Sequence, residues 1–262
     1  MEEEAKREPA VDASQALRAL EDSLRECDRC GLCTGRTQVV FGVGNPQAEL
    51  MFVGEGPGFH EDRLGEPFVG QAGKLLTELL GGIGLTRGDV YIANVVKCRP
   101  PENRDPLPDE LEACGPHLMD QIAIIRPRVI CTLGRFATKR LAGTELSITA
   151  IHGKAKEKEL GGVDTVIFPV FHPAAALYTP ANRQVLVDDF GKLRRLLDLG
   201  AEALRGGAGA LEQESIGRPG AGEPGPNQPS PKQSGEAERA PGSEGPHPAR
   251  PDSPRTEQLH LW

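Results

Sequence analysis

Residues 49–76, ELMFVGEGPGFHEDRLGEPFVGQAGKLL, contain the local signals that decide the fold. The apolar run ELMFV at 49–53 predicts a strand, and it leads directly into the glycine-rich segment GEGPG at 54–58. From Gly73 onward the leucines of GKLLTELLGGIG predict a helix, which the glycines at its end stop. A strand, a glycine-rich turn and a helix in this order indicate an α/β protein.

The same alternation continues along the chain. Further strand signals lie at 90–98 (VYIANVVKC), 128–134 (RVICTLG) and 165–173 (TVIFPVFHP). Helical signals lie at 15–27, 107–125, 134–143 and 185–200. We therefore predict a three-layer α/β/α sandwich with a central four-stranded parallel sheet. Ligands of such sheets bind at the carboxyl ends of the strands, and the unusual loops of this chain follow those ends.

Composition divides the chain into three parts. Residues 1–14 predict a flexible acidic N-terminus, residues 15–199 one α/β domain, and residues 200–262 a disordered tail rich in proline and glycine. The charged start MEEEAKREPA lacks the apolar core of a signal peptide, and no apolar run reaches the length of a membrane span. We therefore expect a soluble, cytoplasmic protein.

The net charge of −8 argues weakly against a nucleic-acid partner. The location of the charge matters more than its sum, and more than half of the excess acid lies outside residues 20–199. The middle of the chain carries local basic groups such as Arg99 with Arg104. These groups fit a phosphate-binding face, and they fit a mixed solvated surface equally well.

Four of the six cysteines have the spacing of a metal centre. Cys27 and Cys30 form a C-x-x-C pair, and Cys98 and Cys114 follow as two dispersed thiols. Four thiolates fit an iron–sulfur cluster, and they also fit a structural zinc ion. Zinc sites more often show two close pairs, so the spacing favours iron. The alternative is a set of small buried hydrophobic side chains.

The two remaining cysteines receive different interpretations. Cys33 forms a second C-x-x-C with Cys30 and is therefore the rival fourth ligand. Cys131 lies inside the apolar run RVICTLG, where we expect it to pack as a buried hydrophobic side chain.

Three long motifs carry a family resemblance. GEGPGFHEDRLGEPFVGQAGKLL (54–76), VYIANVVKCRPPENRDPLPDE (90–110) and FPVFHPA (168–174) follow a C-x-x-C pair in this order. Together they resemble the family 4 uracil-DNA glycosylases over about residues 27–199. The resemblance implies the uracil-DNA glycosylase fold, release of uracil from DNA in base excision repair, and a [4Fe–4S] cluster. The implied ligands are Cys27, Cys30, Cys98 and Cys114, without Cys33.

The resemblance also implies a tight pocket for a base that has been flipped out of the DNA stack. In that pocket the glycines let the backbone approach uracil, Phe68 offers a face for stacking, and Glu61 excludes the methyl group of thymine. Considered alone, a Phe after Pro is more often part of a core, and Glu61 reads as a solvated carboxylate. The implied uracil-binding residues are Gly54, Glu55, Gly56, Glu61, Phe68, Asn94 and His172.

Three residues are candidates for the chemistry. An amide at Asn94, between apolar residues at a strand end, is costly unless satisfied, and it can accept from uracil N3–H and donate to O4. His172, between a strand and Pro173, can stabilise the uracil anion as a fixed donor to O2. Other glycosylase families place a water-orienting Asp where this chain has Gly56, so Glu55 becomes the candidate for that role. The alternatives are a capping Asn and a structural His.

Several further residues are expected to contact DNA. Gly70 and Gly73 let a helix begin close to the backbone, with its amide groups facing phosphate. Arg99 is expected to meet phosphates, and the segment PAAALYTPANR should press apolar side chains into the gap left by the flipped base. The large candidates in that segment are Leu177 and Tyr178; the alternative is a plain connection between strand and helix.

The tail ends in QLHLW, which resembles the bacterial peptide that binds the replication sliding clamp. The residues that match are Gln258, Leu259, Leu261 and Trp262. A disordered linker of about fifty residues would raise the effective concentration of the domain near the clamp. The alternative is an accidental apolar end, and we otherwise expect a monomer.

The leading interpretation is a monofunctional uracil-DNA glycosylase that leaves an abasic site. A broader deaminated-base glycosylase is the alternative within enzymes. A non-catalytic or covalent uracil-DNA-binding protein is the alternative from another class, although no inserted basic loop with a histidine lies between Lys97 and Cys114. A cluster-based redox sensor is more distant.

Overall fold

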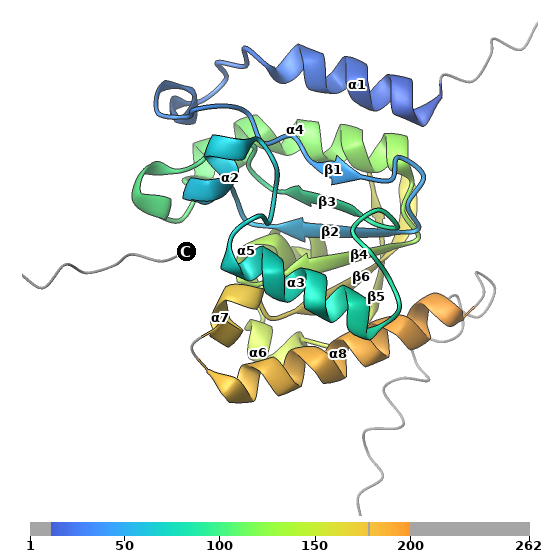
Figure 1. Ribbon diagram of the computed structural model, residues 1–262. Helices are drawn as coiled ribbons and strands as arrows, with labels where there is room; N and C mark the ends of the chain where they lie inside the picture. Colours follow the sequence, from blue (N-terminus) through green and yellow to red (C-terminus); the bar gives the residue numbers. More distant parts are fainter. Residues whose placement is uncertain (1–11, 178, 200–262) are drawn as a thin grey trace, which may run out of the picture. The chain divides into compact units, whose positions relative to one another are not determined.

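A computed structural model describes residues 12–177 and 179–199 of the chain. These residues form one six-stranded sheet with helices on both faces (Figure 1). Across the sheet the strand order is β1-β3-β2-β4-β6-β5. The strands are β1 (Val43–Gly44), β2 (Leu50–Gly54), β3 (Tyr91–Asn94), β4 (Val129–Leu133), β5 (Lys156–Leu160) and β6 (Val163–Val170).

The four central strands are parallel, as the sequence predicts. β2 pairs with β3 on one side and with β4 on the other, and β4 pairs with β6. The prediction of four strands misses the two edges, because β1 and β5 add antiparallel strands there. β1 has only two residues, and the sequence KEKEL of β5 is too polar to signal a strand. Two glycines with positive φ, Gly161 and Gly162, turn β5 back onto β6.

Eight α-helices are described. The sequence predicts α1, α3, α4, α5 and α8, whereas α2, α6 and α7 have six, four and five residues and are too short for periodicity to reveal. Short turns of other helix types lie at η1 (Gly31–Thr34), η2 (Pro101–Asn103) and η3 (Lys139–Gly143). The helices are α1 (Ala13–Leu24), α2 (Phe59–Leu64), α3 (Gln71–Gly82), α4 (Pro108–Ile125), α5 (Arg135–Thr138), α6 (Ile148–Ile151), α7 (Pro173–Leu177) and α8 (Pro180–Asp198).

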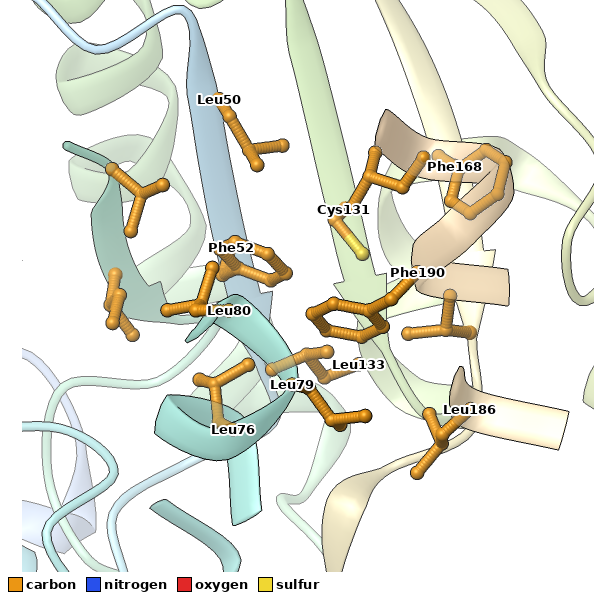
Figure 2. Packing of buried hydrophobic residues seen from close by; sticks show 14 of the residues in the cluster. Leu50, Phe52, Leu76, Leu79, Leu80, Cys131, Leu133, Phe168, Leu186 and Phe190 are labelled. Carbon is orange, nitrogen blue, oxygen red and sulfur yellow. The ribbon is translucent and has the colours of Figure 1, made fainter. Parts of the chain in front are cut away.

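One face of the sheet packs against α3 and α8 (Figure 2). Alternate residues of β2, Leu50 and Phe52, point to this face because side chains alternate along a strand. The ring of Phe52 stacks on Phe190 of α8 with centroids 5.8 Å apart. The leucines of α3 complete this core, as the helical spacing predicts: Leu75, Leu76, Leu79 and Leu80.

The other face packs against α1 and α4, which Figure 1 shows on the opposite side of the sheet from α3 and α8. The other residues of β2, Met51 and Val53, point to this face. Leu17 and Leu24 of α1 are buried here, as predicted, and Leu20 packs against them. Because all four central strands are covered on both faces, their residues are almost all apolar.

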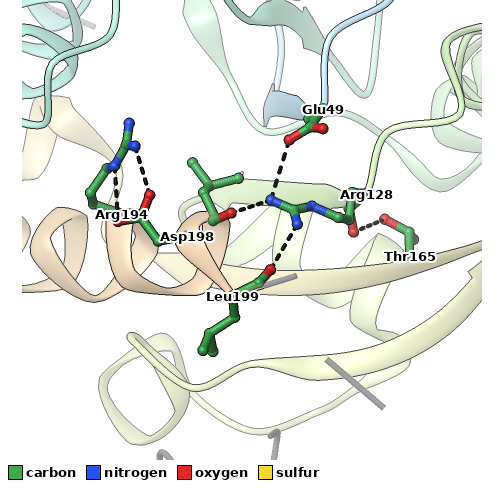
Figure 3. Close-up of polar contacts among 7 residues, drawn as sticks. Glu49, Arg128, Thr165, Arg194, Asp198 and Leu199 are labelled. Carbon is green, nitrogen blue, oxygen red and sulfur yellow. Dashed lines mark hydrogen bonds and ion pairs between the residues drawn. The ribbon is translucent and has the colours of Figure 1, made fainter. Parts of the chain in front are cut away.

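A partly buried arginine holds the end of α8 at the opposite edge of the sheet from the strand carboxyl ends (Figure 3). Arg128, just before β4, donates to the carbonyls of Leu197 and Leu199, the latter at 2.8 Å. It also forms an ion pair with Glu49 at 3.2 Å. The last carbonyls of a helix have no partner within the helix, so Arg128 caps α8 and joins it to the sheet.

Among the described helices, none is long and apolar enough to cross a membrane.

Candidate active site and cysteine-lined cavity

The ends of β2 and β3 bring Phe68 and Asn94 together over Gly54. A Cβ atom on Gly54 would lie 2.5 Å from Oδ1 of Asn94 and 2.6 Å from the ring of Phe68. Only a residue without a side chain allows this approach. The amide of Asn94 and the aromatic ring of Phe68 therefore lie next to each other beside Gly54, although 26 positions separate them along the chain.

The backbone of Phe68 is in the left-handed region, at φ 55°, which non-glycine residues rarely adopt. Two contacts hold it there. Arg87 donates to the Phe68 carbonyl at 3.1 Å and to the Pro67 carbonyl at 2.7 Å. A Cβ on Gly73 would lie 1.8 Å from the same Phe68 carbonyl oxygen, so the first turn of α3 can pack here only with glycine at position 73. Sequence reasoning missed Arg87 and gave Gly73 a role toward DNA alone.

Asn94 is 2% exposed, and its Oδ1 has no hydrogen-bond partner among the described residues. An unpaired buried acceptor is costly, so its presence points to a ligand that donates to it. The backbone carbonyl of Asn94 accepts a 2.8 Å hydrogen bond from Nζ of Lys97. The Asn94 side chain is therefore free while its backbone is held.

His172 lies beside this pair, two residues after the end of β6. Its ring centroid is 5.6 Å from that of Phe68. The backbone N–H of Ala174 donates to Nδ1 of His172 at 3.2 Å, so a neutral ring carries its proton on Nε2. Desolvation lowers the pKa of His172 to about 4. The ring is therefore a neutral Nε2–H donor at neutral pH.

Glu55 follows Gly54 at the same edge. Burial, together with the negative charge of Asp105, raises the pKa of Glu55 to about 7, although the positive charge of Arg135 opposes the shift. Asp105 and Arg135 themselves form an ion pair of 2.7 Å. A carboxylate with a pKa near neutrality is suited to exchange protons with water.

The carboxylate of Glu61, in α2, is fixed by two backbone amides. Its Oε1 accepts from Val69 at 2.9 Å and from Gly70 at 3.0 Å. These bonds hold Glu61 against the loop before α3, so it is not the solvated carboxylate that the residue considered alone would suggest. Position 56 favours glycine for a steric reason, because a Cβ there would lie 2.7 Å from the side chain of Val96.

The residues expected at DNA differ in how they are held. Arg99 donates from Nε to Asn103 at 2.7 Å, and its guanidinium lies 5.2 Å from the ring centroid of the exposed Phe59. Arg104 is instead committed to Glu110 through two hydrogen bonds of 2.8 and 2.6 Å.

The segment after His172 is a short helix, α7, and not an irregular loop. Leu177 at its end is 41% exposed. Tyr178 lies outside the described residues.

The four cysteines singled out by spacing line one cavity. Cys27, Cys30, Cys98 and Cys114 border it together with Cys33. Cys131 is fully buried in β4 among apolar side chains, which confirms its assignment to the core.

Polar groups of the protein lie close to three of these sulfurs. The backbone N–H of Lys97 lies 3.2 Å from Sγ of Cys114, Arg36 lies 3.6 Å from Cys98, and His117 lies 4.0 Å from Cys27. Burial raises the pKa of the Cys98 thiol to about 11. Buried thiolates at neutral pH therefore need a cation or cationic cluster to stabilise them.

The arrangement of the donors bears on which metal group they fit. No three His, Cys, Asp or Glu side chains within residues 12–177 and 179–199 converge on a single ion position. Tetrahedral zinc needs all of its sulfurs about 2.3 Å from one point. A [4Fe–4S] cluster binds each cysteine to a different iron atom, so its ligands surround a larger volume. Cysteines around one cavity have the donor chemistry that such a cluster needs.

The fold and this site define a class. The model of the uracil DNA glycosylase superfamily matches residues 41–193, and the chain belongs to this superfamily.

Similar proteins place the chain more narrowly, among type-4 uracil-DNA glycosylases. It is 50% identical over 187 residues to a type-4 uracil-DNA glycosylase of Archaeoglobus fulgidus, covering 69% of this chain and 94% of the relative. It is 49% identical over 191 residues to one of Sulfurisphaera tokodaii, covering 69% and 84%. A Thermotoga maritima relative of the same name is 44% identical, with 70% and 95% covered.

Proposed function

We propose that this chain is a uracil-DNA glycosylase, which hydrolyses the N-glycosidic bond of deoxyuridine flipped out of DNA and leaves an abasic site for repair. Family membership supports the class of reaction. The observation that carries the proposal is the buried, unpartnered Oδ1 of Asn94 beside the ring of Phe68.

Uracil is recognised by its flat face and its hydrogen-bonding edge. The base stacks on Phe68, and Asn94 accepts from N3–H and donates to O4. Cytosine presents the opposite pattern at both positions, so it leaves the buried amide mispaired. Glu61, held by two backbone amides, is a rigid obstacle beside C5 and excludes the methyl group of thymine.

The leaving group is stabilised by His172. Negative charge develops on the uracil ring as the glycosidic bond breaks, and Nε2–H of His172 donates to O2. A neutral donor supports this role, because the desolvated ring does not need to release a proton. Glu55 orients the attacking water, directly or through solvent, and its raised pKa is suited to that role.

DNA is held by the loops around this edge. Gly70 and Gly73 bring the amino end of α3 close to the phosphates, Arg99 contacts a phosphate, and Leu177 with Tyr178 fills the space left by the flipped base. The exposure of Leu177 supports its part. Single- and double-stranded uracil DNA are both substrates under this proposal.

Cys27, Cys30, Cys98 and Cys114 would hold a [4Fe–4S] cluster. When bound, the cluster supplies a structural cross-link and takes no part in the glycosidic step. It would join the segment after α1 to the loop after β3 and to α4, close to the DNA-contacting Arg99. Zinc is the alternative, since it accepts the same thiolate ligands.

The glycosylase domain is residues 15–199, and it acts as a monomer. The terminal peptide 258–262 binds the replication sliding clamp; Gln258, Leu259, Leu261 and Trp262 lie outside the described residues. A peptide of residues 250–262 should displace a known clamp ligand from the purified clamp. Failure to compete would remove this part of the proposal and leave the glycosylase untouched.

Strand cleavage by alkali at a single uracil tests the activity. The wild-type chain should produce the abasic cut, and His172→Ala and Asn94→Ala should each reduce its rate on the order of 10²-fold or more. A strand that stays intact with the wild-type protein, although the protein binds the oligonucleotide, would leave a uracil-DNA-binding protein and no enzyme.

A further inference from the structure

We infer that Lys97 is a positioning residue that fixes Asn94 at the end of β3 and links it to the cysteine-lined cavity. This inference rests on the uracil-reading role proposed for Asn94. Lys97 makes no contact with substrate under this view; it acts through the backbone of Asn94.

The side chain of Lys97 is 1% exposed, and its amine donates two hydrogen bonds. Nζ donates to the carbonyl of Asn94 at 2.8 Å and to Oε1 of Gln121, in α4, at 2.5 Å. Gln121 in turn donates to the carbonyl of Phe41 at 3.0 Å. The amine therefore holds the carbonyl of Asn94, the last residue of β3.

Burying an amine here costs more free energy than burying an apolar side chain would. Both of its hydrogen-bond acceptors, the Asn94 carbonyl and the Gln121 amide, are uncharged. Removing an ammonium from water costs several kcal/mol unless its partners compensate, and an apolar side chain would pack here without that cost. A hydrogen bond that orients a functional strand end is a physical reason to keep it.

The same residue touches the cysteine cavity through its backbone. The Lys97 N–H lies 3.2 Å from Sγ of Cys114, and Cys98 is the next residue in the chain. One residue thus contacts a cysteine ligand through its main chain and the uracil-reading strand end through its side chain. Replacing the side chain leaves the contact to Cys114 in place, so the two functions can be separated.

Lys97→Met in the full chain removes the amine and keeps the length and the apolar stem. We expect kcat/KM for uracil in a single-stranded oligonucleotide to fall on the order of 10²-fold, since a displaced reading group costs that much. Iron and sulfide content, and affinity for the same oligonucleotide with thymine, should stay at wild-type values. The first readout depends on Asn94, whereas the other two report the cluster and the DNA surface.

Gln121→Met is the matched control, because it removes a partner of the same amine at the same depth but leaves the bond to Asn94. It should lower the melting temperature and keep kcat/KM close to wild type. Lys156→Met, on the exposed edge strand β5, sets the baseline for losing a surface lysine. Equal losses of kcat/KM in Lys97→Met and Gln121→Met would overturn the inference.

A double-mutant cycle with Asn94→Ala completes the test. If Lys97 acts through Asn94, its substitution should cause no further loss in the Asn94→Ala background. If Lys97→Met lowers kcat/KM as much in the Asn94→Ala background as in the wild type, the inference about Lys97 is wrong and the proposed role of Asn94 is unaffected. Wild-type kcat/KM in Asn94→Ala would instead refute the proposed role of Asn94. Should Lys97→Met not fold, Lys97→Arg enters the same cycle, where its smaller loss should likewise vanish.

Discussion

At the scale of single residues, the protonation of Glu55 should be visible in the rate. Burial raises the pKa of Glu55 from 4.5 to about 7, so the carboxylate is protonated below that pH and ionised above it. If the ionised form orients water, kcat/KM should fall about tenfold per pH unit below pH 7. His172, with a pKa of about 4, stays neutral across this range and causes no further change in kcat/KM.

Glu55→Gln should abolish the fall of kcat/KM below pH 7, leaving a low and pH-independent kcat/KM between about pH 5 and pH 7. The folded protein disfavours the ionised form, so stability is lost as pH rises from 4.5 to about 7. Glu55→Gln should therefore also raise the melting temperature at neutral pH. A wild-type profile that is flat below pH 7 would remove Glu55 from the mechanism.

Gly73 allows a second residue-level test, independent of any charge. Gly73→Ala places a Cβ against the carbonyl of Phe68, so either α3 or the Phe68 ring must move. We expect a loss of kcat/KM on the order of 10²-fold together with a lower melting temperature.

Gly81→Ala, in the same helix, is the matched control. A Cβ on Gly81 meets nothing within 4 Å, so this substitution should stabilise the protein by about 0.5–1 kcal/mol without changing the rate. If both substitutions behave alike, the close contact between Gly73 and Phe68 is not what sets the activity.

At the scale of elements, the end of α8 depends on Arg128. Arg128→Ala leaves the carbonyls of Leu197 and Leu199 without their donor, and we expect a loss of about 1–3 kcal/mol in the free energy of unfolding. Urea unfolding measures the loss, and hydrogen exchange should show that it concentrates at the end of α8.

Arg194→Ala in the same helix serves as the comparison. Its ion pair with Asp198 lies on the surface, where solvent and salt screen the charges and such a pair contributes little to stability. A loss from Arg128→Ala no larger than that from Arg194→Ala would show that the cap contributes little.

At the scale of the whole molecule, the cysteine cavity joins segments from distant parts of the chain. Cys114→Ser should lose iron and sulfide, and it should lower the melting temperature on the order of 10 °C, because metal binding contributes to folding. Colour and metal analysis measure the first, and thermal unfolding the second.

Cys33→Ser and Cys131→Ser are the controls for this experiment. Cys33 lines the same cavity but stands outside the proposed ligand set, and Cys131 lies in the core, so both variants should keep their iron. If Cys33→Ser loses its iron and Cys114→Ser keeps it, then Cys33 and not Cys114 is the fourth ligand.

The sequence alone determined the parallel core and its helices, because side-chain periodicity is a local property. It missed β1, β5 and the helices α2, α6 and α7, which are too brief or too polar to have a period. The long motifs pointed to Phe68, Asn94 and His172, and the cysteine spacing pointed to one metal centre. Only the tertiary structure decided how these residues meet. The point above Gly54, the clash that requires Gly73 and the buried amine of Lys97 all depend on contacts between distant segments. Local patterns carry no record of such contacts, since packing creates them.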